Sequence, residues 1–276
     1  MSAKLASILN LNAEKVAGIF LELASEQRLN ILNHLSEKEL NISKLAKLLD
    51  ATNPEVHRNV GRLVKNGLIV KNTDGNYKLT TYGRTALIQI PSFSFVSENK
   101  GFFNEHALSN MNSKFIQRIG GLESKKEIKG FVKVLEKWIK IQENADKFIY
   151  NILSEIPYSK DIIDVIANKL EKKIPIKSIF FENVVVPENR KKIFEKKGFQ
   201  KYVSEGLLER KISKNKGIGL LITDKEAAVF FPNPDGDTDL SRMFHSKEPE
   251  FKEWCMDYFE DSWKDATSFQ ESKLKV

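Results

Sequence analysis

Over residues 25–84 this chain alternates helical and extended patterns in an order that few small folds share. Ser25 is a good helix cap, and the leucines that follow it repeat at helical spacing. A second short helix is predicted over residues 42–49, with its leucines on one face. Residues 50–53 then form a polar turn, so a third helix follows almost at once.

The third helix has clear signals at both of its ends. Asn53 suits the cap, Pro54 suits the first helical position, and Gly67 suits the residue at which the helix stops. The elements predicted after it are strands over 68–70 and 77–80, a hairpin turn over 73–76 and a helix over 81–88. Three helices and a tight hairpin are the order of a winged helix-turn-helix, whose third helix enters the DNA major groove.

The third helix separates apolar from cationic residues. Val56, Val60 and Leu63 share the face that should pack on the preceding helices, and three cations lie opposite. Arg58 is placed to read guanine, whereas the later cations suit phosphates. The residues predicted to contact DNA, from this helix and the hairpin, are Asn53, Glu55, His57, Arg58, Arg62, Lys65, Lys71, Asn72, Asn76 and Lys78.

The charge distribution favours an anionic partner for the first part of the chain. The net charge is +7, and residues 42–84 hold eight basic against three acidic residues. Residues 224–265 reverse the balance, with five basic and twelve acidic residues. A basic module that binds double-stranded DNA, joined to an acidic module that does not, would show this asymmetry. The alternative for the charged helix face is an ordinary solvated surface.

The complete pattern predicts an α+β protein, with an N-terminal winged helix-turn-helix followed by an α/β effector-like domain. The expected domains are residues 1–90 for DNA binding, 91–123 as a connector and 124–276 as a ligand-binding module. Phe102 and Phe103 are expected to dock the connector onto a core. The remaining predicted elements are helices over 124–156, 161–170, 188–197 and 249–269, and strands over 176–186, 207–212, 219–223 and 227–231.

Several segments resemble known prokaryotic regulators. Residues 26–32, 42–49, 55–63 and 67–69 resemble the arsenical-repressor-like winged helices. The second half resembles the effector domain of archaeal one-component regulators typified by the methanogenesis regulatory protein. The segments that carry this second resemblance are Glu105-His106, Arg118-Ile-Gly-Gly-Leu122, Leu221-Ile-Thr-Asp-Lys225, Phe231-Pro-Asn-Pro-Asp-Gly236 and residues 254–263.

The resemblance implies a dimeric transcription regulator whose C-terminal domain binds a small effector of unknown identity. Aromatic residues of that domain are more often core than ligand contacts. If an effector binds, the residues expected near it are Lys225, Phe230, Phe231, Arg242, Trp254 and Trp263. The helices over 13–24 and 81–88 are the expected dimer contacts.

Other chemistries find little support in the sequence. Cys255 is the only cysteine, and the four histidines are scattered, so no metal site or cofactor is predicted. His245-Ser-Lys247 begins like a phospholipase-type motif, but Lys252 stands where an aspartate is required. His245 is therefore expected to be a surface residue, and no enzyme activity is predicted.

The chain contains no apolar run long enough to cross a membrane and no signal-peptide pattern, so a cytoplasmic location is expected. Two rival functions remain open. One is an architectural, chromatin-type DNA-binding protein without an effector, which would show weak sequence preference. The other is an enzyme domain attached to a winged helix.

Overall fold

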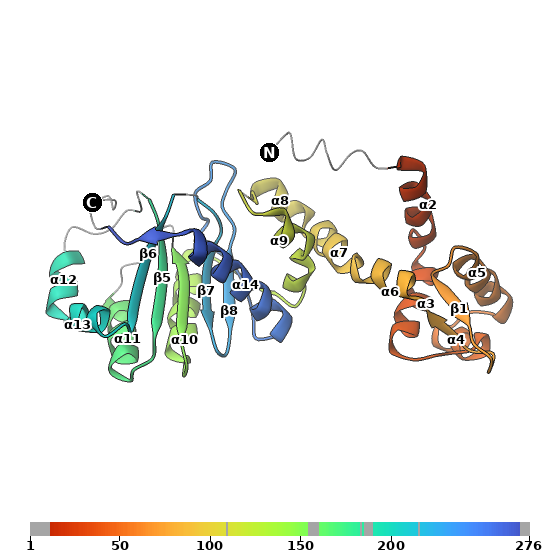
Figure 1. The fold of residues 1–276 in the computed structure, drawn as a ribbon, viewed down its shortest axis with the longest axis horizontal. Coiled ribbons are helices and arrows are strands. Elements are labelled where there is room, and N and C mark those ends of the chain that lie inside the picture. The colour runs from red at the N-terminus through yellow and green to blue at the C-terminus, as the bar shows by residue number, and fades with distance from the viewer. Residues whose placement is uncertain are drawn as a thin grey trace. The chain divides into compact units, whose positions relative to one another are not determined.

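The structure is a computed structural model that describes residues 12–108, 110–153, 160–182, 184, 190–214 and 216–270. The chain divides after Ile90 into two compact units. We call them the first and the second unit and describe each by itself (Figure 1). None of the helices within the described ranges is both long and apolar enough to cross a membrane.

The first unit contains the predicted elements in the predicted order. A single apolar core joins its helices to a two-stranded antiparallel sheet. The elements are α2 (Ala13–Leu23), α3 (Glu26–Glu37), α4 (Ile42–Leu48), α5 (Asn53–Lys65), β1 (Ile69–Lys71), β2 (Tyr77–Leu79) and α6 (Thr81–Ile88).

Local side-chain chemistry accounts for the ends of these helices. The Ser25 hydroxyl accepts from the amide of Arg28, as predicted for a cap of α3. Gly67 follows α5 with a φ of +73°, a conformation that a residue with a Cβ adopts at a cost. One assignment was wrong: the cap of α5 is Thr52, because its amide donates to Glu55 Oε2 at 2.9 Å and completes a capping box.

Gly83 allows α6 to approach the backbone that precedes β1. A Cβ at this position would lie 1.9 Å from the Leu68 carbonyl oxygen. The Thr80 hydroxyl donates to the Gly67 carbonyl at 2.6 Å and accepts from the Gly83 amide at 2.9 Å. The start of α6 is therefore fixed against the end of α5.

Gly83→Ala should destabilise the first unit by about 1–3 kcal/mol or more, because the added methyl group meets backbone that cannot move aside. Amide hydrogen exchange in α3 and α5 would measure the loss. The matched control is Gly61→Ala, where a Cβ meets nothing within 4 Å. That control should stabilise α5 by about 0.5–1 kcal/mol. Equal exchange rates in the two variants would contradict the close approach.

The second unit is built on an eight-stranded sheet with the order β10-β6-β5-β4-β7-β8-β9-β3. β4, β5 and β6 are mutually parallel, and the other neighbours are antiparallel. The strands are β3 (Lys126–Lys129), β4 (Ile149–Leu153), β5 (Ile176–Phe181), β6 (Leu208–Ser213), β7 (Gly219–Thr223), β8 (Ala227–Phe230), β9 (Arg242–Ser246) and β10 (Thr267–Ser268).

Helices cover both faces of this sheet. Figure 1 shows α14 (Pro249–Asp265) across one face and α10 (Phe131–Glu143) and α11 (Lys160–Glu171) on the other. Alternate residues of β4 enter two different cores: Ile152 packs with α14, and Ile149 packs with α10. The remaining helical elements are α7 (Ile90–Glu98), α8 (Lys100–Glu105), α9 (Ser113–Gln117), the 3-10 helix η1 (Ile119–Leu122), α12 (Arg190–Lys196) and α13 (Phe199–Ser204).

Residues 91–123, predicted as a connector, belong to the second unit. Phe95, Phe115 and Leu122 are at most 2% exposed and lie in the core cluster that includes Trp254 of α14. Phe102 and Phe103 pack in the same cluster, as their predicted docking role requires. The segment is folded because its aromatic residues are buried against the α14 face.

The prediction of helix over residues 124–156 was wrong in two places. β3 precedes α10, and β4 follows it, while residues 154–156 lie outside the described part. β4 lies between β5 and β7 and is covered on both faces, so its sequence lacks the alternation that marks a half-exposed strand. Parts of two other predicted elements, at 183, 185–186 and 188–189, also fall outside the described residues.

A buried carboxylate joins α10 to the antiparallel half of the sheet. Glu226 is 5% exposed and lies 2.7 Å from Lys137 Nζ and 2.6 Å from His245 Nδ1. His245, expected at the surface, is only 8% exposed because β9 pairs on both sides. Burial alone would raise the pKa of Glu226, but hydrogen bonds from His245 and Lys137 outweigh it and lower the pKa to about 2.

Glu226→Gln should destabilise the second unit at pH 7 by on the order of 3 kcal/mol, since the folded-state pKa of Glu226 lies far below its ordinary value of 4.5. This contribution is complete above about pH 4.5 and is lost as the pH falls towards 2. Urea unfolding followed by tryptophan fluorescence reports this unit, which holds all three tryptophans. The difference from the wild type should therefore shrink below pH 4.5. Exposed Glu136, which lies on α10 next to Lys137, provides the Glu→Gln control.

Candidate nucleic-acid interface

α5 presents one buried and one exposed face, as its sequence indicates. Val56, Val60 and Leu63 are at most 1% exposed and belong to the core of the first unit. The polar residues of α5 that are exposed and whose side chains make no hydrogen bond or ion pair with any described residue are Asn53, His57, Arg58 and Lys65. These four side chains are available to an external partner.

Glu55 differs from these neighbours because the capping box already uses its carboxylate. One oxygen accepts from the amide and from the hydroxyl of Thr52, at 2.9 and 2.8 Å. These hydrogen bonds lower the pKa of Glu55. Glu55, predicted to contact DNA, therefore fixes the start of α5.

Among the hairpin residues predicted to contact DNA, one side chain holds the turn together and others are exposed at the surface. The Asn72 side-chain oxygen accepts from the amides of Asp74 and Asn76, at 3.0 and 2.9 Å, so it holds the turn together. Lys71 is exposed beside the Tyr77 ring, and Lys78 lies 3.7 Å from a carboxylate oxygen of Glu39. Both lysines are exposed enough to reach a polyanion.

Arg62, a predicted DNA contact, has a partner inside the first unit. Its Nη2 lies 2.6 Å from Oε1 of Glu22 in α2, and its Nε donates to the other oxygen at 3.0 Å. The Glu22 side chain is 8% exposed, and that of Arg62 is 47% exposed. The hydrogen bonds from Arg62 hold the pKa of Glu22 below its ordinary value, against the effect of burial.

A second arginine extends this contact to α3. Arg28 Nε lies 3.6 Å from Glu22 Oε2 and donates to the Glu22 carbonyl at 2.6 Å. Arg28 Nη1 donates to Asn59 of α5, and the Asn59 amide in turn donates to Gln27. We call Glu22, Gln27, Arg28, Asn59 and Arg62 the arginine network. Because it joins α2, α3 and α5 by side chains of fixed geometry, it holds α5 in the orientation that its buried apolar face sets.

Glu22→Gln should destabilise the first unit by about 1.5–3 kcal/mol, the value of hydrogen bonds to a charged group, since the amide leaves two buried or half-buried arginines without a counter-charge. Urea unfolding of the full chain, with exchange of the α2, α3 and α5 amides as the local readout, would measure it. Glu14→Gln is the control, because Glu14 lies exposed on the same helix. A loss no larger than that of the control would show that the arginine network contributes nothing to stability.

The aromatic residues predicted to surround an effector do not converge. Phe231 and Trp254 are at most 1% exposed in the core beneath α14, whereas Phe230 packs in the core on the other side of the sheet. Trp263 stacks on Phe259, with ring centroids 5.5 Å apart. These four side chains fill cores and leave no shared site.

The two cations of that prediction also have partners. Lys225 pairs with Asp146 at the surface. Arg242 lies 2.6 Å from Glu127 and 3.2 Å from Glu105, with its guanidinium over the Phe102 ring. Lys225 thus belongs to a surface ion pair and Arg242 to a largely buried one, and the two cations share no pocket.

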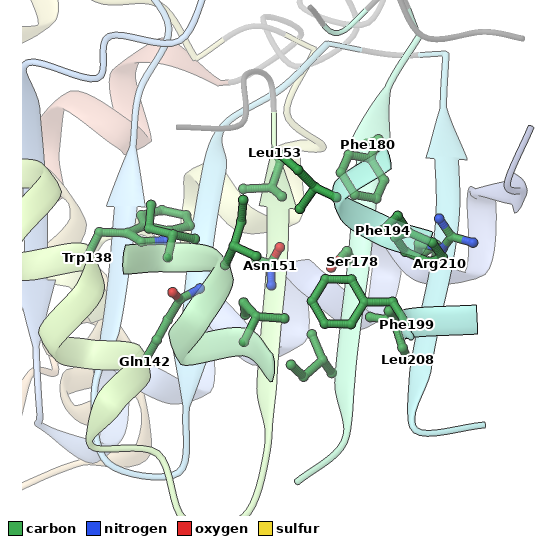
Figure 2. A pocket seen from close by; sticks show the side chains of 15 residues that line it. Trp138, Gln142, Asn151, Leu153, Ser178, Phe180, Phe194, Phe199, Leu208 and Arg210 are labelled. Carbon is green, nitrogen blue, oxygen red and sulfur yellow. The ribbon is translucent and has the colours of Figure 1, made fainter. Parts of the chain in front are cut away.

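A cavity does exist in the second unit, but on the α10 and α11 side of the sheet (Figure 2). Its lining includes three buried polar residues, Gln142, Asn151 and Ser178, none of which was expected from the sequence. The sequence did contain a signal for a polar site here, because Asn151 and Ser178 are polar residues within the apolar segments that form the buried strands β4 and β5. Within the described ranges, no group of three or more His, Cys, Asp or Glu residues lies close enough together to hold a metal ion.

Comparison with known proteins adds one family match. The family described as HVO_A0261 N-terminal domain matches residues 17–99, which include α3 to α6. No curated protein matches the chain.

Three solved structures show weak similarity. TrmBL2, an archaeal chromatin protein with a novel mode of DNA binding, is 13% identical at a TM-score of 0.42, covering 98% of this chain and 100% of its own. Nuc, a phospholipase D family member from Salmonella typhimurium, is 12% identical at a TM-score of 0.38, and the match covers 54% of this chain and 99% of Nuc. The transcriptional repressor BigR from Xylella fastidiosa is 20% identical at a TM-score of 0.29, and the match covers 34% of this chain and 95% of BigR. Similarity this weak assigns no function to the chain.

Proposed function

We propose that this chain is a DNA-binding transcription regulator whose first unit acts as a winged helix-turn-helix. The observation that carries the proposal is the outer face of α5, where Asn53, His57, Arg58 and Lys65 are exposed and unpaired within the described part of the chain. The helix itself is held rigidly by its core face and by the arginine network. A rigid helix with free cations and amides facing outward suits the major groove.

The residues of this face take different roles. Arg58, one turn from the start of α5, is placed to donate two hydrogen bonds to guanine. Lys65 lies in the last turn and suits a phosphate. Arg62 keeps part of its guanidinium exposed, but Glu22 engages two of its nitrogens, so its contribution to DNA binding is smaller than that of a free arginine. Lys71 and Lys78 of the hairpin add phosphate contacts beside the groove.

We infer that the regulator is a homodimer. α2 exposes Leu21 to 62%, and α6 exposes Tyr82 to 50% and Ile88 to 66%. Large apolar side chains exposed on two helices of a small unit suit association with a second copy. A two-fold dimer would place two α5 helices about one turn of DNA apart. A small effector bound by the second unit would then shift the dimer between two DNA-binding states.

The proposal is tested by selecting bound sequences from a random DNA library and measuring affinities across salt concentrations. Selection should recover two related half-sites. On the selected site, Arg58→Ala should cost about 1–3 kcal/mol and relax the preference at one base pair. Lys65→Ala should weaken selected and random DNA alike and reduce the salt slope by about one.

Lys133→Ala is the control, because Lys133 is exposed on α10 of the second unit, which contributes no residue to the proposed DNA contacts. Equal losses on selected and random DNA for both α5 variants would overturn the assigned roles. Binding without any motif would instead favour an architectural protein of the chromatin type, and an absence of binding would exclude DNA as the partner.

A further inference from the structure

The cavity in the second unit lies between the sheet and four helices. Its floor is formed by β4, β5 and β6, and its walls come from α10, α11, α12 and α13. The walls are mostly apolar and include Trp138, Ile163 and Phe199. The volume is about 120 Å³. Apolar cavities of about 150 Å³ hold a molecule of the size of benzene, so this smaller cavity has room only for a small organic ligand of at most about that size.

A row of polar side chains crosses the floor of this cavity. In the parallel register, Asn151 of β4 is paired with Ser178 of β5, and Ser178 is paired with Arg210 of β6. All three line the cavity, because residues in register on neighbouring strands point to the same face. Asn151 is 3% exposed and Ser178 is 6% exposed. Neither side chain makes a hydrogen bond to another described residue.

Gln142 of α10 lies opposite this row. It is 2% exposed, and its Oε1 has no hydrogen-bond partner among the described residues. Figure 2 shows its carboxamide directed across the cavity towards Asn151. Burying a carboxamide oxygen without a partner is unfavourable, and an apolar residue of similar shape would pack there at no such cost. Gln142 Oε1 therefore lacks a hydrogen-bond donor, which a bound ligand can supply.

The chemistry of the row limits what that partner can be. Each carboxamide offers two donor hydrogens and an acceptor, and the Ser178 hydroxyl offers one donor and two lone pairs. Arg210 is the one charged residue of the lining, and its guanidinium lies over the rings of Phe194 and Phe269, 4.6 and 4.2 Å from their centroids. In Figure 2 it points away from Asn151 and Ser178. A charged ligand group placed between Gln142 and Asn151 would thus find no counter-charge there.

We propose that this cavity binds a small uncharged molecule with an apolar body and a carboxamide head group. The apolar body fills the space beside Trp138, and the head group exchanges hydrogen bonds with Gln142, Asn151 and Ser178. The site lies within the second unit, so the proposal does not depend on the first unit binding DNA. It gives the effector of the proposed regulator a place that the aromatic residues selected from the sequence do not provide.

The test uses the full chain without DNA and three small carboxamide probes: propionamide, butyramide and isobutyramide, none of which has more heavy atoms than benzene. Nitrogen–proton NMR spectra follow the side-chain amides of Gln142 and Asn151 during titration. At least one probe should shift both signals and saturate, and isobutyrate, which has the size of isobutyramide but carries a charge, should bind at least about tenfold more weakly. Failure of all three carboxamides, or equal binding of isobutyrate, would overturn the proposal. Neither result bears on DNA binding.

Gln142→Leu separates a ligand-binding role from a structural one. It should weaken the carboxamide at least about tenfold and yet raise the melting temperature of the second unit by about 2–4 °C, because it removes a buried group that lacks a partner. Ser178→Ala is a milder second variant and should also weaken binding while the chain stays folded. Gln200→Leu is the matched control, since Gln200 is exposed on α13. Unchanged binding in both cavity variants, or a lower melting temperature for Gln142→Leu, would overturn the assignment.

Discussion

The first unit depends on one buried carboxylate. Glu22 accepts from Arg62 of α5 and lies beside Arg28 of α3, so a single charge connects three helices. Arg28 also donates to the α2 backbone, which leaves α2 no freedom to separate from α3. Hydrogen bonds between charged groups have narrow geometry, whereas apolar contacts allow small rotations. The buried apolar face of α5 sets which side points outward, and the arginine network holds the helix in that orientation against α2 and α3.

In the second unit the sheet is covered by helices on both faces, which leaves little room for buried polar groups. Where such groups occur, most are paired, as in the contact of Glu226 with Lys137 and His245. Among the described residues, Thr238 Oγ1 lacks a partner, and so do Gln142 Oε1 and the side chains of Asn151 and Ser178 in the row across β4 and β5, which lie around one cavity. Burying a polar group costs free energy unless the group is hydrogen-bonded. The paired cluster around Glu226 and the unpaired side chains of Asn151 and Ser178 therefore indicate different roles. The first holds α10 to the sheet, and the second is open to a ligand.

Local signals predicted the first unit well because its short elements carry their own boundaries. Ser25, Gly67 and the hairpin glycine act on the backbone within a few residues, and α6 begins and ends where the sequence indicates. The cap of α5 was misplaced by one residue, since Thr52 and Glu55 together form a better cap than Asn53. β4 could not be recognised in this way. Its apolar residues serve two cores, and a continuous apolar run fits a buried strand or a helix equally well.

The sequence by itself determined most helix ends of the first unit, the hairpin, the amphipathic face of α5 and the exposed residues that make DNA the proposed partner. Only the tertiary structure decided that Arg62 is engaged by Glu22, that residues 91–123 join the second unit, and that the selected aromatic residues are core. It also brought Gln142 to Asn151 and Ser178. The reason is that caps and turns act over neighbouring residues, whereas ion pairs and cavities join strands and helices far apart in the chain.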